Sequence, residues 1–324
     1  MRTITREEFF EEIKDGILAY MPEGNGWKVD IRETLKNNDQ ILHALNITRE
    51  GQSVVPNLYL EPFFEKVEKG EDLENVCVEV ASTYTRALQA GPSVSVPDLD
   101  FDAVKDQLRV HVVEASRNEK MLRNMLYRSL GNGFVMTAHI NLPEVGEGSG
   151  SIRVTRELAM SLGWKTSEIW EEAMKNTMEK EPATLSDLHR MLMGIMNDRK
   201  DPDTFLTEDT EIDPSEELLV LTNPSRMFGA MTLFYPETQE RIAAAVGGDY
   251  FVLPSSIHEV LIVRDNGKIT AEDLVQMVRE VNATQVAPEE VLADKVLRYD
   301  RKEKTLSIAA EQTPEREKDV REER

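Results

Sequence analysis

The sequence predicts an α+β fold. We expect an N-terminal helix plus a three-stranded antiparallel meander with helices, and then a mixed-sheet α/β body built of β-α-β-β-α-like units. Apolar residues recur at helical spacing over 6–20, whereas apolar and polar residues alternate over 27–60. Beyond residue 100, short apolar runs of strand length alternate with helical patterns. A chain of 324 residues is long enough for roughly two or three structural units.

The first expected unit covers residues 1–92 in the order α-β-β-β-α-α. Thr5 and Glu8 have the spacing of a capping box at the start of the first helix. Asn37-Asn38-Asp39 is typical of a turn between two strands, and Pro56 indicates that the third strand is an edge or is interrupted. The expected strands lie at 27–31, 43–47 and 54–60, and the expected helices at 6–20, 61–68 and 72–89.

The second expected unit covers residues 93–215 and is of α/β type. Its apolar runs predict strands at 110–113 and 134–140, and a strand that continues into a short helix over 151–158. Helical patterns occupy 101–107, 117–127, the residues from 166 onward, and 184–197. Residues 184–215 are a candidate insertion, because 198–215 are rich in Asp, Pro, Thr and Glu and are typical of a loop.

The third expected unit covers residues 216–310 and is also of α/β type, followed by a charged tail over 311–324 that we expect to be disordered. Its expected strands lie at 218–221, 250–254 and 260–264, its helices at 225–234, 236–246, 271–281 and from Pro288 onward, and its closing hairpin at 296–308. A Ser-Arg pair follows an apolar strand at both Ser116 and Ser225. This weak internal similarity suggests that the middle and last units share one order of helices and strands.

Composition narrows the classes of partner and the compartment. The chain has 60 acidic and 38 basic residues and a net charge of −22. This charge disfavours nucleic acid and an anionic membrane surface, since both attract Lys and Arg. The single cysteine, Cys77, allows no internal disulfide, and no apolar run approaches the roughly 18–20 residues of a membrane span. We therefore expect a cytoplasmic protein, and its oligomeric state stays open.

Three segments of the chain resemble a known family. They are Val55-Pro56-Asn57-Leu58-Tyr59-Leu60-Glu61, Leu253-Pro254-Ser255-Ser256-Ile257-His258-Glu259-Val260 and Val281-Asn282-Ala283-Thr284-Gln285-Val286-Ala287-Pro288-Glu289-Glu290-Val291-Leu292. Together with Leu221-Thr222-Asn223 they look like the hallmark segments of the bacterial domain-of-unknown-function family 5688. The order of elements in the middle and last units is also distantly similar to YtpQ-like uncharacterised proteins. The resemblance implies a bacterial cytoplasmic protein, with an association with mobile elements as a further expectation, and implies no activity.

The polar segment from Ser255 to Glu259 is the first candidate for chemistry. In an extended chain, Ser256 and His258 share one face, and a Ser-His couple with a carboxylate such as Glu259 is the arrangement of nucleophilic catalysis. Residues i and i+2 of a strand stand about 6–7 Å apart, too far for a hydrogen bond without a bend. The alternatives are a ligand-binding loop and a plain turn whose hydroxyls satisfy backbone groups.

The second polar cluster is Asn282, Thr284 and Gln285, between a helix end and Pro288. These side chains are candidates for ligand binding together with Ser255, if both loops lie at one end of the same sheet. The alternative is a structural role, with Asn282 closing the preceding helix. The sequence alone does not place the two loops relative to each other.

No metal site and no cofactor is expected. The five histidines are scattered, His258-Glu259 lacks the second histidine of a zinc motif, and no glycine pattern matches a phosphate-binding loop. The sequence therefore favours a cytosolic interaction or regulatory protein with an unknown protein partner. A hydrolase-like enzyme and a small-ligand sensor, each using the 255–259 and 282–285 loops, are the alternatives.

Overall fold

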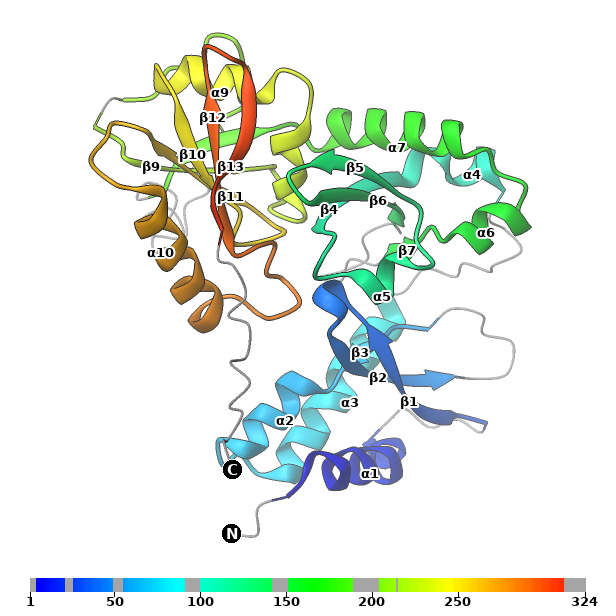
Figure 1. Ribbon diagram of the computed structural model, residues 1–324. Coiled ribbons are helices and arrows are strands. Elements are labelled where there is room, and N and C mark those ends of the chain that lie inside the picture. The colour runs from blue at the N-terminus through cyan, green and yellow to red at the C-terminus, as the bar shows by residue number, and fades with distance from the viewer. Residues whose placement is uncertain are drawn as a thin grey trace, which may run out of the picture. The chain divides into compact units, whose positions relative to one another are not determined.

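The structure is a computed structural model that describes residues 4–20, 26–48, 55–90, 100–141, 151–188, 204–213 and 215–311 (Figure 1). Its contacts divide the chain into two compact units. The first consists of Met1–Arg109, Glu119–Leu126 and Ala138–Ala173, and the second of Val110–Asn118, Tyr127–Thr137 and Met174–Arg324. The expected boundaries at 92 and 215 follow the chain order and stay predictions. Apart from Glu311, the expected tail lies outside the described residues.

The N-terminal elements follow the predicted order. They are α1 (Arg6–Gly16), β1 (Lys28–Leu35), β2 (Ile41–Thr48), β3 (Leu58–Tyr59), α2 (Glu61–Glu68) and α3 (Leu73–Ala90). The capping box is confirmed, because Thr5 Oγ1 accepts the Glu8 amide at 3.2 Å and Glu8 Oε2 accepts the Thr5 amide at 3.0 Å. The three strands form an antiparallel meander in the order β1-β2-β3, in which β3 is an edge strand, as Pro56 indicated, and is shorter than the expected 54–60.

The core of this first part lies between the meander and its helices. Its members are Phe9, Ile13 and Ile17 from the first helical segment, Leu45 and Ile47 from β2, and a row from α2 and α3 that includes Tyr84. The Tyr84 hydroxyl accepts the Ile47 amide at 2.6 Å and donates to the Ile47 carbonyl at 3.2 Å. In the described residues, β3 pairs with Ala44 and Leu45 of β2 and does not reach Ile47. The Tyr84 hydroxyl therefore takes the place of a neighbouring strand and satisfies the Ile47 backbone groups.

The middle of the chain forms a four-stranded sheet in the order β4-β6-β5, with β7 beside β6. Its elements are α4 (Phe101–Val104), β4 (Leu108–Glu114), α5 (Glu119–Leu122), β5 (Tyr127–Gly131), β6 (Phe134–Asn141), β7 (Ser151–Arg153), α6 (Arg156–Ser161) and α7 (Thr166–Lys180). The helix expected over 117–127 is only the single turn α5. Tyr127 already pairs with Thr137 of β6, across a hairpin turned by Gly131, Asn132 and Gly133, all with positive φ.

The C-terminal sheet has six strands in the order β13-β12-β10-β11-β9-β8. Its elements are β8 (Thr184–Asp187), β9 (Leu218–Thr222), α9 (Thr238–Val246), β10 (Tyr250–Leu253), β11 (Val260–Arg264), α10 (Ala271–Thr284), β12 (Lys295–Asp300) and β13 (Thr305–Glu311). The α+β class is confirmed, but this sheet is not mixed, because all of its pairings are antiparallel. The β10–β11 and β12–β13 links are too short for the crossover that parallel strands need.

Two further local expectations are wrong. Thr184–Asp187, expected to begin a helix, is the edge strand β8, while residues 189–203 lie outside the described part. The residues after Pro288 form a turn, not a helix. Their backbone groups bond instead to the segment that follows β10: Ile257 donates to Glu290, and Leu292 to Ser255. Tertiary hydrogen bonds thus outweigh the local helix signal at both places.

The middle and last parts agree in the order of their first three strands, while the common plan that the Ser-Arg pair suggested stays a prediction. Each begins with a strand, a helical segment and two further strands, but in the middle part the additional strand β7 precedes the next helix. In each, the third strand lies between the first and the second, which gives β4-β6-β5 and β9-β11-β10.

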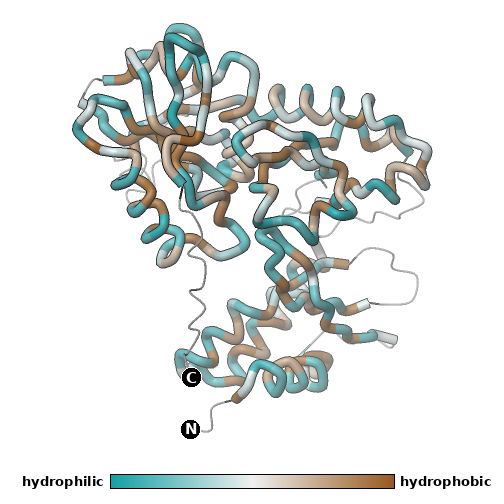
Figure 2. Tube along the Cα trace, in the orientation of Figure 1, coloured by the Kyte–Doolittle hydropathy of each residue, from teal (hydrophilic) through white to brown (hydrophobic). Residues whose placement is uncertain are grey.

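α10 covers one face of the C-terminal sheet through an apolar stripe. Leu274, Val275 and Val278 pack against Phe251 and Leu253 of β10. The hydropathy colours alternate along α10 in Figure 2, as an amphipathic helix requires. No helix in the described part of the chain is both long and apolar enough to cross a lipid bilayer.

Candidate functional site

The segment from Ser255 to Glu259 links β10 to β11, and backbone hydrogen bonds join it to the stretch of chain that follows Pro288. Ser255 and Ser256 are buried, at 7% and 5% exposure. The partner is the extended stretch that follows the Pro288 turn, and the bonds run from Ile257 to Glu290 (2.8 Å), from Leu292 to Ser255 (3.1 Å) and from Ala293 to Pro254 (2.9 Å). The segment therefore behaves as an irregular extension of the sheet, with its backbone groups satisfied by protein.

The Ser256 hydroxyl is used inside the segment. Its Oγ accepts the amide hydrogen of His258 at 3.0 Å, and its side chain is hydrogen-bonded to the Glu259 carboxylate. The hydroxyl thus contacts the backbone of His258 and not its imidazole. A serine nucleophile needs the opposite arrangement, with its proton directed at a basic nitrogen.

The His258 ring holds a neighbouring loop. Its Nδ1 accepts the Phe228 amide hydrogen at 3.1 Å, and its Nε2 lies 3.5 Å from Glu290 Oε1. Because Nδ1 is the acceptor, the ring proton is on Nε2, and the neutral ring has no second lone pair. The ring is therefore placed as a structural clamp between Phe228 and Glu290.

Glu259 is the group in this segment whose titration is perturbed. Burial raises the pKa of the Glu259 carboxyl, and the nearby Glu290 raises it further, while the Ser256 hydrogen bond and Arg226 lower it. A partly buried carboxyl with a raised pKa is one feature of functional sites, and structural networks produce it as well.

The loop clamped by His258 is closely packed. Phe228 has a φ of 54°, in the left-handed region, and its ring stacks on His111 at 3.7 Å between centroids. A Cβ on Gly229 would lie 2.5 Å from the His258 carbonyl oxygen and would also clash with Thr222 Oγ1. Thr222 donates to that same carbonyl at 2.8 Å. Sequence reasoning missed these residues. The helix expected at 225–234 is a 3-10 helix over Gly229–Phe234 only, and Asn223-Pro224 was a signal for the turn that precedes it.

Of the second cluster, only Asn282 reaches the same stretch of chain. Its Nδ2 donates to the Ala293 carbonyl at 3.1 Å and to Asp294 Oδ1 at 2.7 Å, and the residue is buried. Thr284 donates back to the Glu280 carbonyl within α10, and Gln285 donates to Thr284 on the exposed surface. Both loops therefore hydrogen-bond to the stretch that ends at Asp294, and Ser255, Thr284 and Gln285 stay candidates for ligand binding.

Two adjacent ion pairs continue this network. Asp294 Oδ2 accepts Arg117 Nη1 at 2.6 Å, and Lys295 Nζ lies 2.5 Å from Glu114 Oε1. The second pair is buried, with side-chain exposures of 8% for the lysine and 9% for the glutamate. Together the pairs fasten the end of β4 to the start of β12 within the second unit.

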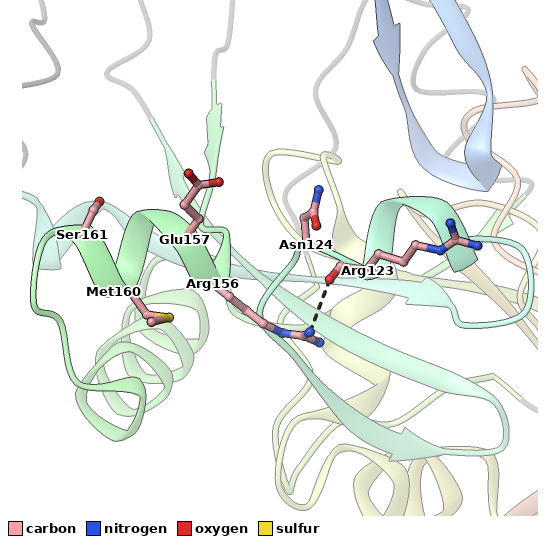
Figure 3. Close-up of a pocket in the computed structure, with 6 residues that line it drawn as sticks. All are labelled: Arg123, Asn124, Arg156, Glu157, Met160 and Ser161. Atoms are coloured by element: carbon pink, nitrogen blue, oxygen red, sulfur yellow. Dashed lines mark hydrogen bonds between the residues drawn. The ribbon is translucent and has the colours of Figure 1, made fainter.

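Among the described residues, no group of three or more His, Cys, Asp or Glu side chains has a geometry suited to a metal ion. Two surface hollows are described. One of about 540 Å³ is lined by Arg123, Asn124, Arg156, Glu157, Met160 and Ser161 (Figure 3), and one of about 250 Å³ lies beside β8. Neither is lined by the candidates at 255–259 or 282–285.

Comparison with known proteins gives a family and no activity. Residues 6–301 match the family of unknown function DUF5688. No curated protein matches the chain significantly. No solved structure matches it significantly either. The match covers both the N-terminal meander and the 255–259 and 282–292 segments, so the chain belongs to the DUF5688 family of unknown function.

Proposed function

We propose that this protein acts in the cytoplasm by binding a protein partner and is not itself a catalyst. The bonding of the His258 ring carries the proposal. Its acceptor nitrogen is occupied by the Phe228 amide, and the Ser256 hydroxyl is bonded to the amide of His258 and not to the ring. Ser256 and His258 are the best candidates for a nucleophile and its base. Their hydrogen bonds instead connect parts of the backbone to each other.

The partner that we propose carries a basic surface. A net charge of −22 attracts positively charged proteins and repels nucleic acid and anionic membranes. Binding of this kind weakens steeply with salt, because the Debye length falls from about 10 Å at 0.1 M to about 3 Å at 1 M ionic strength. In a pull-down with the purified chain, the partner should be retained at low salt and released at high salt. Retention that is insensitive to salt, or no retained partner, contradicts the proposal.

Replacing His258 tests its structural role directly. His258→Ala removes the acceptor of the Phe228 amide, and we expect a lower melting temperature. His258→Asn keeps an acceptor near the position of Nδ1 and should recover most of the loss. Neither variant should change partner binding per folded molecule. If His258→Asn were fully stable and yet lost a measurable activity of the wild-type protein, the ring would have a chemical role.

The alternative is a hydrolase-like enzyme or a small-ligand sensor that uses the 255–259 and 282–285 loops. The raised pKa of Glu259 is the observation that favours it, because burial makes this carboxyl hold its proton more readily than an ordinary one, as a general acid must. An enzyme requires that His258→Ala abolish turnover without loss of fold. A sensor requires that a metabolite raise the melting temperature, and that the rise disappear in Asn282→Ala or Ser255→Ala.

A further inference from the structure

The hollow beside α6 has walls that are fixed by the backbone. The Arg156 amide donates to the Asn124 carbonyl at 2.9 Å, and the Leu126 amide donates to the Val154 carbonyl at 3.2 Å. Thr155 caps α6 by accepting the Leu158 amide at 3.0 Å. Arg123 and Asn124 therefore form one wall and the first turns of α6 the other, all within the first unit.

The chemistry of this hollow differs from that of the chain as a whole. Its lining includes two arginines, Arg123 and Arg156, and one acid, Glu157, in a chain of net charge −22, and Figure 3 shows the Arg123 guanidinium extending away from α6. Arg156 Nη1 donates to the Arg123 carbonyl at 3.3 Å, which holds its guanidinium across the gap between the walls (Figure 3). The lining is thus locally suited to carboxylates, with the planar donors that bind them best.

Met160 gives the hollow an apolar contact. It is 81% exposed, the largest exposed fraction among the large hydrophobic residues in the described part of the chain. Figure 3 shows Met160 and Arg156 pointing to one side of α6, as their spacing of four residues requires, while Glu157 and Ser161 point to the other. A flexible thioether beside a guanidinium suits a ligand that has an apolar group next to an anionic one.

We propose that this hollow binds an acidic segment of another protein, whose carboxylates pair with Arg123 and Arg156 while an adjoining apolar side chain packs on Met160. A volume of about 540 Å³ lies within the range of roughly 300–1,000 Å³ that is usual for ligand sites, and a single phosphate would leave the methionine unused. The inference goes beyond the proposed function, because the ligand has the opposite charge to the basic partner and uses a different surface. Salt at physiological strength screens the distant acids, since the Debye length is then about 8 Å.

Fluorescence anisotropy with the full chain tests the proposal. The probe is a short labelled peptide in which acidic residues flank a leucine. Arg123→Gln and Arg156→Gln should each weaken its binding about tenfold, the equivalent of one charge-assisted hydrogen bond. Arg156→Lys should lose less. Met160→Ser should weaken the leucine peptide several-fold and leave unchanged a peptide in which serine replaces the leucine.

Matched controls separate the hollow from general surface charge. Met277 and Arg279 are an exposed methionine and an exposed arginine on α10. Met277→Ser and Arg279→Gln should leave binding unchanged. The proposal is overturned if the acidic peptide does not bind, or if the α10 variants weaken it as much as the α6 variants do. Inorganic phosphate that binds with the same dependence on Arg123 and Arg156 would overturn it in favour of a small-anion site. A lysate pull-down with no basic partner would defeat only the proposed function.

Discussion

Lys295→Met should destabilise the second unit strongly, because it leaves a buried carboxylate without a cation. Lys295 Nζ lies 2.5 Å from Glu114 Oε1, donates to the Asn132 carbonyl at 3.1 Å and lies 5.0 Å from the centre of the Phe134 ring. Both charged side chains are less than a tenth exposed. Methionine is an unbranched side chain one atom shorter than lysine, and it removes the charge together with the hydrogen bond to Asn132, so the perturbation is mainly electrostatic.

The expected magnitude follows from this burial. Removing one partner of a buried ion pair costs about 3–5 kcal/mol, because the remaining ion is desolvated and uncompensated. In a domain of this size, about 1 kcal/mol shifts the melting temperature by about 2–4 °C, so we expect a fall of about 6–20 °C. The double variant Lys295→Met with Glu114→Leu removes both charges, and should recover most of the loss or exceed the wild-type stability.

Urea unfolding and thermal melting of the wild type, both single variants and the double variant form a double-mutant cycle. Lys304 and Glu240 provide the control, because their charged atoms are 2.6 Å apart but their side chains are 63% and 52% exposed. Lys304→Met should change the melting temperature little. The reasoning is refuted if Lys295→Met melts within a degree or so of the wild type, or if the double variant is no more stable than Lys295→Met.

Three further predictions concern single side chains. Tyr84→Phe removes the hydroxyl that satisfies both backbone groups of Ile47, and should cost about 1–3 kcal/mol in urea unfolding; a loss below about 0.5 kcal/mol would contradict this role. Gly229→Ala forces a Cβ against the His258 carbonyl and should cost about 1–3 kcal/mol, whereas an unchanged melting temperature would show that the loop can move aside. Burial raises the folded-state pKa of Glu259, so its ionisation opposes folding as pH rises from the unfolded pKa through the folded one. Glu259→Gln should therefore gain stability relative to the wild type with rising pH and show no gain below about pH 4; a gap that is constant between pH 4 and 7 would count against it.

The elements that follow from short-range patterns could be predicted from the sequence. The capping box at Thr5 and Glu8 involves residues three apart, and the apolar stripe of α10 repeats every three or four residues. The expectation failed where distant backbone competed with a local signal. Thr184–Asp187 pairs with β9 as an edge strand, and the residues after Pro288 pair with the 255–257 segment instead of forming a helix.

For the candidate site, too, some features could be predicted from the sequence and others depended on the tertiary structure. The sequence alone identified the polar segment at 255–259, its resemblance to a family, and the acidity of the chain, since each depends only on which residues are present. Tertiary structure decided that Phe228 takes the acceptor nitrogen of His258, that Lys295 meets Glu114, and that Arg123 and Arg156 share one hollow. Hydrogen bonds and ion pairs act over about 3 Å, so which groups meet depends on how distant segments fold together, and Arg117 and Asp294, for example, are 177 residues apart in the chain.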